Sequence, residues 1–177
     1  MNKLCRLLRY EWPLHFVLLI TNWLPDNVVF LRLRGALAKH FIGKCGVDLR
    51  IGRNVNLYNP KLMSIGDHVY IAYGSLFLAD DQISIEDEVV FGPYCVLPSS
   101  NHTSFEKSFR YGSPQKAPIS IGKGTWIGTH VIITAGSNIG ENCLIAAGAV
   151  VTSEIPSGTI AGGIPAKVIK NVEEVRY

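Results

Sequence analysis

The sequence predicts a mainly β fold, a parallel β-helix of hexapeptide repeats preceded by a short α-helical segment. Residues 121–156 divide without remainder into six hexads, and every hexad opens with Ile or Val. The fifth place of each hexad holds a small or β-branched residue. Residues 1–44 lack this frame and instead carry apolar and basic residues at helical spacing. An ordinary sandwich would show strands at roughly 8 to 12 residues with unequal turns, so the regular period favours the β-helix.

Each hexad corresponds to one short strand and one turn. The branched first residue points inward, the fifth residue fills the remaining interior space, and Gly, Asn or another polar residue takes the turn. Three hexads make one triangular coil, and a single coil cannot bury its own apolar face. Stability therefore comes from stacking, with each inward Ile or Val contributing about 1.5 to 3 kcal/mol when fully buried.

The composition predicts one domain whose basic charge is concentrated at its N-terminal end. The chain has 177 residues, 47% of them apolar and 18% charged, which disfavours disorder. Residues 1–44 hold seven Lys or Arg and two acidic residues, whereas residues 45–177 hold ten and twelve. Such a basic segment could favour an anionic membrane surface or a phosphate-bearing substrate, and no aromatic-interleaved basic run indicates nucleic acid binding.

The N-terminal segment is predicted to form two or three short helices, separated by Pro13 and by residues 24–26. The pattern of residues 27–41 puts apolar side chains near one side and distributes Arg32, Arg34 and Lys39 as surface charges. Two interpretations remain: an amphipathic element on a membrane surface, or a cap over the open end of the β-helix. The apolar run 14–20 is too short to span a bilayer and lacks a cleavage site. We therefore expect a cytoplasmic protein, with peripheral contact at the inner face of the cell membrane as an option.

The hexads are predicted to begin at Ile51 and to be interrupted twice before residue 121. Residues 77–84 are eight where six are due, so the chain should bulge at residues 79–81 and project the carboxylates of Asp80 and Asp81. The frame then breaks at Leu97, and residues 99–118 contain no hexad. A loop of this length inside a regular solenoid is usually functional or disordered. We expect the β-helix domain to cover residues 45–172, followed by a tail, residues 173–177.

The four cysteines show no CxxC or CxxH pairing, so the sequence indicates neither a disulfide framework nor a zinc site. Cys95 and Cys143 occupy the fifth place of a hexad and are expected to be buried. Cys95 lies seven residues before His102 and is the candidate for a covalent mechanism, but its inward position argues against that role.

The hexads from Ile51, the loop with Asn101 and His102, and the ending AGGIPAKVIK together resemble the hexapeptide-repeat acyltransferases. The resemblance covers residues 45–172 and is greatest to galactoside and maltose O-acetyltransferases and to sugar O-acetyltransferases of bacterial polysaccharide biosynthesis. It implies a left-handed β-helix and a homotrimer with active sites between subunits. It also implies transfer of an acetyl group from acetyl-CoA to a hydroxyl of a sugar or glycan intermediate, with no metal.

Acetyl transfer to an alcohol requires a base, and histidine is suited to this role near neutral pH. Only His102 lies in the loop, and it matches the catalytic histidine of the family. We therefore expect direct transfer without an acyl-enzyme. Because carboxylates and amides hydrogen-bond sugar hydroxyls, we expect Asp80, Asp81 and Asn101 to bind the acceptor. The residues expected to bind coenzyme A are Trp126, Thr129, Ala147 and Thr152 along the coils, with Lys167 and Lys170 near the nucleotide phosphates.

Other acceptors and other classes of protein are alternative interpretations of the sequence. The chain lacks the asparagine that galactoside enzymes carry near residues 74–75, which argues against a simple galactoside acceptor. An amino acid or antibiotic acceptor is an alternative, as is a non-catalytic scaffold, although the His102 loop disfavours a scaffold. A metal enzyme of the γ-class carbonic anhydrase type would need histidines spaced H-x4-H, and Lys107 occupies the place five residues after His102.

Overall fold

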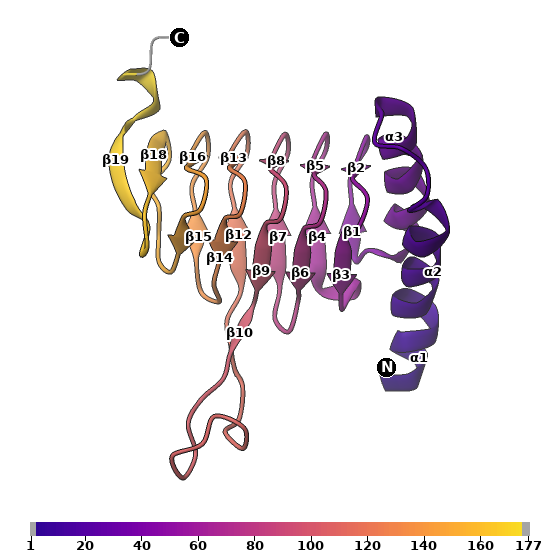
Figure 1. Ribbon diagram of the computed structural model, residues 1–177, viewed down its shortest axis with the longest axis horizontal. Helices are drawn as coiled ribbons and strands as arrows, with labels where there is room; N and C mark the ends of the chain where they lie inside the picture. The colour runs from indigo at the N-terminus through magenta and orange to yellow at the C-terminus, as the bar shows by residue number, and fades with distance from the viewer. Residues whose placement is uncertain (1–2, 175–177) are drawn as a thin grey trace.

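The structure is a computed structural model that describes residues 3–174, in which stacked triangular coils are covered at one end by helices (Figure 1). Residues 175–177 of the predicted tail lie outside the described residues. The coils are built from three parallel sheets, which we call A, B and C. Sheet A contains β1 (Lys44–Cys45), β4 (Met63–Ile65), β7 (Ile83–Ile85), β12 (Ile119–Ile121) and β15 (Asn138–Ile139). Sheet B contains β2 (Arg50–Ile51), β5 (Tyr70–Ile71), β8 (Val90–Phe91), β13 (Trp126–Ile127), β16 (Leu144–Ile145), β18 (Thr159–Gly162) and the antiparallel β19 (Lys167–Asn171). Sheet C contains β3 (Asn56–Tyr58), β6 (Leu76–Leu78), β9 (Val96–Pro98), β14 (Ile132–Ile133) and β17 (Val150–Val151).

The strand register confirms that the first residues of the hexads stack in columns. In sheet A, Ile65 pairs with Ile85, Ile85 with Ile121, and Ile121 with Ile139. These side chains are buried and form part of one continuous hydrophobic core. The coils follow one another without a change of register, so they give a rigid support for the segments that leave the corners.

Two boundaries of the repeat differ from the sequence prediction. Leu97 does not break the frame, because it stays in β9, points inward and is fully buried. The chain leaves the coil two residues later, at Ser99. At the C-terminal end the coil continues past Pro156, since β18 pairs in parallel with β16. Strand β19 then folds back on β18 (Figure 1).

The N-terminal segment forms helices that lie against the first coil (Figure 1). The helices are α1 (Lys3–Arg6), a π-helix (Leu7–Glu11), α2 (Trp12–Thr21), α3 (Val28–Ala38) and a 3-10 turn (Lys39–Phe41), and further 3-10 turns are Pro60–Leu62 and Val172–Glu174. Asn27 caps α3 by accepting a hydrogen bond from the Phe30 N–H at 3.1 Å. Within residues 3–174, no helix combines the length and apolar character needed to cross a membrane.

The prediction that Pro13 separates two helices is wrong. Pro13 lies at the start of α2, and the helical path runs through it from Lys3 to Thr21. A proline inside an α-helix normally clashes with the carbonyl four residues earlier. Here the wider π turn precedes it, and the Trp12 N–H bonds to the Leu7 carbonyl five residues back. The altered hydrogen-bond pattern accommodates the proline ring.

The prediction that Arg34 is a surface charge is also wrong. Its side chain is only 1% exposed, below α3 and against the first coil. One guanidinium nitrogen donates to Asp26 Oδ1 at 2.7 Å and to the Ile51 carbonyl at 3.0 Å, and a second donates to the Leu24 carbonyl. Arg34 therefore connects the turn between α2 and α3 to strand β2, and its charge is neutralised by Asp26.

Candidate active site

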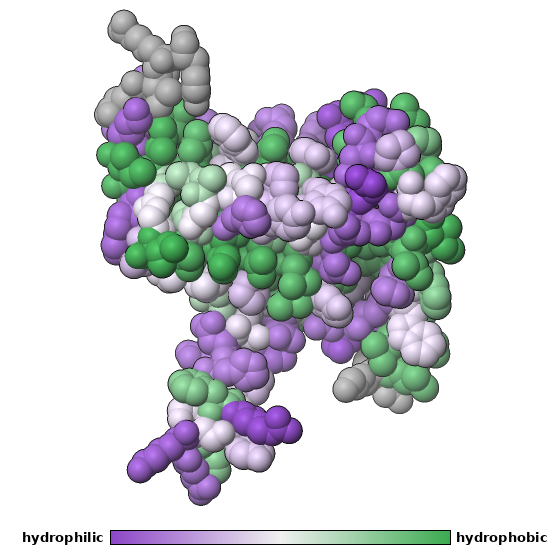
Figure 2. Space-filling view, viewed as in Figure 1, coloured by the Kyte–Doolittle hydropathy of each residue, from purple (hydrophilic) through white to green (hydrophobic). Residues whose placement is uncertain are grey.

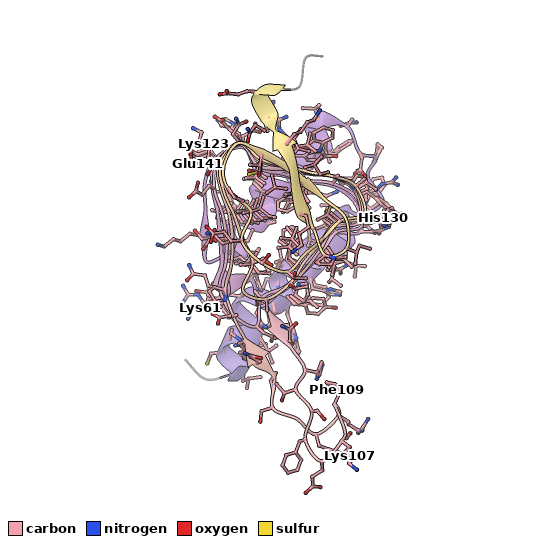
Figure 3. All side chains as sticks on the ribbon, turned by 90° about the vertical axis from the view of Figure 1, so that its left-hand side faces the viewer. Lys61, Lys107, Phe109, Lys123, His130 and Glu141 are labelled. Atoms are coloured by element: carbon pink, nitrogen blue, oxygen red, sulfur yellow. The ribbon has the colours of Figure 1, made fainter. Side chains whose placement is uncertain are left out.

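Residues 99–118 form a hairpin that projects from the corner between sheets C and A (Figures 1 and 3). Its base is the antiparallel pair β10 (Ser100–Asn101) and β11 (Gln115–Lys116). The Ala117 N–H donates to the Ser99 carbonyl at 3.1 Å and closes this base. Lys107 and Phe109 lie toward the far end of the hairpin in Figure 3. The loop predicted from the missing hexads is thus an ordered two-stranded excursion.

Asp80 and Asp81 occupy the same corner one coil earlier, and they hold the base of the hairpin. Ser100 Oγ donates to Asp80 Oδ2 at 2.6 Å, and the Asp81 N–H donates to Ser99 Oγ at 2.8 Å. Ser99 is fully buried. The structure therefore brings Asp80, Asp81 and the hairpin base together.

Sequence reasoning missed Ser99 and Ser100. The available signal was two hydroxyl residues placed where the hexads stop. Their partners lie 18 and 20 residues away, so the contacts depend on how the coils stack.

His102 follows β10 directly and is exposed to solvent. Its imidazole has no hydrogen-bond or ionic partner among residues 3–174. An exposed imidazole on a hairpin whose base is held by hydrogen bonds can take a proton from a hydroxyl substrate. Its position is fixed through the backbone pairing of the preceding residue, Asn101, with Gln115.

The residues predicted to bind coenzyme A do not gather around His102 within one subunit. Thr129 and Ala147 stack at the corner between sheets B and C, where the Gly148 N–H donates to the Thr129 carbonyl at 2.8 Å. A Cβ atom at Gly128 would lie 2.7 Å from the Ala147 nitrogen, so this close stacking requires glycine. Trp126 is 51% exposed on the outer face of sheet B.

The other predicted cofactor residues lie farther along the coils. Thr152 is exposed directly after β17, at the same corner as the hairpin. Lys167 and Lys170 are exposed on β19, near the C-terminal end. The predicted set is therefore distributed over two corners, the outer face of sheet B and the terminal strand.

Cys95 is fully buried, as its hexad position predicted. Its thiol donates to the carbonyls of Gly92 at 3.1 Å and Gly128 at 3.2 Å. Burial raises the pKa of Cys95 to about 11, which keeps the thiol protonated near neutral pH. Because the thiolate is the nucleophilic form, this environment argues against an acyl-cysteine intermediate.

Two other histidines and a cavity lie outside the hairpin. Two other histidines, His68 and His130, lie in left-handed turns, and His130 stacks on Tyr94 with ring centroids 4.9 Å apart. Among residues 3–174, no group of three or more His, Cys, Asp or Glu side chains is arranged to hold a metal ion. A cavity of about 530 Å³ lies between α2 and the first coil, away from the hairpin.

The stacked hexapeptide coils form a parallel β-helix, a fold that this chain shares with left-handed β-helix acetyltransferases. The bacterial transferase hexapeptide (six repeats) family model matches residues 118–153. A hexapeptide-repeat acetyltransferase from Vibrio cholerae, solved in complex with acetyl coenzyme A, superposes with a TM-score of 0.82 at 26% identity, covering 96% of this chain and 90% of that one.

Two curated relatives agree with this class. Galactoside O-acetyltransferase of Escherichia coli K12 is 33% identical over 130 residues, which is 70% of this chain and 64% of the relative. A putative lipopolysaccharide biosynthesis O-acetyl transferase of the same strain is 29% identical over 71% of this chain and 66% of the relative. The chain thus spans just under two thirds of either relative. It is similar in sequence and in fold to hexapeptide-repeat proteins that are named acetyltransferases.

Proposed function

We propose that this protein is an acetyl-CoA-dependent O-acetyltransferase acting on a hydroxyl of a sugar or glycan intermediate in cell-surface polysaccharide biosynthesis. The observation that carries the proposal is His102, exposed on a hairpin that Asp80 and Asp81 hold at its base. The names of the matched relatives support the reaction and the class of acceptor. The putative lipopolysaccharide enzyme supports a glycan intermediate more directly than a free galactoside.

The proposed reaction consists of one acyl transfer and two proton transfers. His102 takes the proton of the acceptor hydroxyl as its oxygen attacks the thioester carbonyl. A backbone amide stabilises the oxyanion until the C–S bond breaks. The imidazolium then returns its proton to the leaving thiolate, so His102 is regenerated. Direct transfer agrees with the buried, protonated thiol of Cys95.

Acceptor binding is assigned to the corner that carries the hairpin. Asp80 Oδ2 already accepts from Ser100, and Asp81 Oδ1 accepts from the Gln82 N–H at 2.7 Å. The second oxygen of each carboxylate remains for sugar hydroxyls. Asn101 lies beside His102 in the chain and is exposed. We assign Lys167 and Lys170 to the nucleotide phosphates of coenzyme A, because both ammonium groups are exposed at the end of the coils.

The proposal includes a homotrimer, in which a neighbouring subunit would place its cofactor-binding surface opposite His102. In one subunit, the hairpin leaves the corner between sheets C and A, whereas Thr129 and Ala147 lie at the corner between sheets B and C. The outer face of sheet C carries apolar side chains, including Tyr58 and Ile132, and an apolar band runs along the coils in Figure 2. An apolar outer face of this kind suits contact between subunits.

The proposed activity is tested by incubating the protein with acetyl-CoA and a panel of acceptors. The panel contains free sugars, nucleotide sugars, polyprenyl-linked glycans, amino acids and antibiotics. We expect coenzyme A release, followed with a thiol reagent, only with sugar or glycan acceptors, and an acetylated product by mass spectrometry. Acetylation confined to amino acids or antibiotics would contradict the acceptor class. Absence of release with every acceptor would favour a non-catalytic scaffold.

The subunit arrangement predicts complementation between two inactive variants. His102→Ala removes the base, and Ala147→Asp places a carboxylate in the proposed cofactor wall. If these residues meet across an interface, co-expression of both variants restores about a quarter of the wild-type activity, because a random trimer repairs that share of its sites. Each variant expressed alone provides the control. Mixed oligomers that stay inactive would place both residues in one subunit's site and contradict the arrangement.

A further inference from the structure

The outer surface of the N-terminal helices is apolar. Helix α2 buries Leu14 and Thr21 toward the first coil, and the opposite side of the helix faces solvent. That side exposes Phe16 and Ile20, which are 54% and 65% exposed. Trp12 and Leu19, which are 52% and 57% exposed, lie at its edge and also line the cavity beside the first coil. Figure 2 shows hydrophobic side chains at this end of the molecule.

The apolar stripe extends through the π-helix. Leu4 and Leu8 are 57% and 52% exposed, and with Trp12 and Phe16 they form a series at four-residue spacing. In an α-helix of 3.6 residues per turn, this spacing advances by about 40° at each step. The wider π turn between Leu7 and Glu11 offsets this rotation and keeps the series closer to one side.

Helix α3 continues the same surface. It buries Leu31, Arg34, Gly35 and Ala38 against the coil and exposes Val29, Leu33 and Leu37. Trp23, in the connection between α2 and α3, is 77% exposed. We call the following set the outer cap surface: Leu4, Leu8, Trp12, Phe16, Leu19, Ile20, Trp23, Val29, Leu33 and Leu37.

A cap on a repeat protein normally has a polar outer face, because its role is to end the stacking in solvent. The outer cap surface has the opposite character. Contiguous exposed apolar surface of this kind marks a site of contact with a protein or a membrane.

The charge of the segment distinguishes between these occupants. Its two acidic residues are both paired, Glu11 with Arg6 at 3.2 Å and Asp26 with Arg34 at 2.7 Å. Arg9, Lys39 and Lys44 have no acidic partner among residues 3–174. The segment therefore presents net positive charge, and two such ends placed face to face would repel. An anionic surface is the complementary partner.

We propose that the outer cap surface binds the face of an anionic lipid bilayer, with α2 and α3 lying in the interfacial plane. The apolar side chains enter the boundary between headgroups and acyl chains, and the cationic side chains contact anionic headgroups. Trp12 and Trp23 supply the amphipathic rings that favour this depth. The surface is separate from the His102 hairpin, so the proposal does not depend on the acetyltransferase activity.

The test is flotation of the full chain with vesicles of phosphatidylcholine alone or mixed with phosphatidylglycerol. We expect binding to the mixed vesicles and about tenfold weaker binding of the variant Phe16→Ser, Leu19→Ser, Leu33→Ser. The matched control is Val47→Ser, Phe109→Ser, Ile164→Ser, which removes exposed apolar side chains elsewhere and should bind like wild type. Arg9→Gln with Lys39→Gln should weaken binding to the mixed vesicles.

A fluorescence measurement locates the contact. Trp126→Phe leaves Trp12 and Trp23 as the only tryptophans, and brominated lipids should quench them in the mixed vesicles. The proposal is overturned if the full chain does not float, or if the cap variant floats as well as the control. It is also overturned if wild type forms larger assemblies that the cap variant loses without any vesicle binding, because a second copy would then be the occupant. Acetyl transfer to a water-soluble acceptor, measured in parallel, separates this failure from a failure of the proposed function.

Discussion

Replacing His102 with alanine is expected to lower kcat for acetyl transfer by about 10² to 10⁴-fold, the usual contribution of general-base catalysis. The expected change in KM for acetyl-CoA is small, because His102 lies on the hairpin and not on the coil surface assigned to the cofactor. Steady-state kinetics with the acceptor identified by mass spectrometry measures both quantities.

The matched control for this variant is His68→Ala. His68 is also exposed, but it lies in a turn of the first coils near Asp48 and away from the hairpin. It should retain wild-type kcat. A His102→Ala enzyme with kcat within about tenfold of wild type would show that another group takes the proton.

Replacing Arg34 with methionine should lower the free energy of unfolding by about 3 to 5 kcal/mol. The substitution leaves Asp26 without its buried cation and leaves the carbonyls of Leu24 and Ile51 without this donor. Urea unfolding at one protein concentration measures the effect, since oligomer stability depends on concentration.

Arg32→Met provides the comparison within the same helix. Arg32 also pairs with an aspartate, Asp48, at 2.7 Å, but its side chain is 55% exposed. A solvent-exposed ion pair contributes only about 0 to 1 kcal/mol, so this variant should remain close to wild type. Equal losses in the two variants would show that burial of Arg34 does not determine its contribution.

Much of the fold could be predicted because the same residue types recur at the same hexad places. The inward columns through Ile121 and Ile139 follow directly from this period. The continuous helix through Pro13 could not be predicted in the same way, because it depends on a local change from α to π hydrogen bonding. The prediction that the repeat breaks at Leu97 was wrong because only the hexad after it is missing. The backbone of Leu97 itself still belongs to a strand.

The candidate site could also be predicted only in part from the sequence. The eight-residue interval at Asp80 and Asp81 and the missing hexads after Ser99 predicted that two irregular segments would matter. Their contact through Ser99 and Ser100 could not be predicted from local pattern, because it depends on the length of one coil. The burial of Arg34 could not be predicted for a related reason. Helical spacing shows on which side of the helix a charged residue lies, but the elements packed against the helix determine whether that side is buried.

The hairpin also has a consequence for the entropy of chain closure. The paired residues Ile65 and Ile85 are 20 positions apart, and Ile121 and Ile139 are 18 apart, whereas Ile85 and Ile121 are 36 apart. A doubling of the closed segment costs only about 0.6 kcal/mol in loop entropy. The following coil stacks in the same register despite the insertion. A solenoid corner can therefore accept segments of different length and sequence at little cost to folding, while the remaining coils stay unchanged.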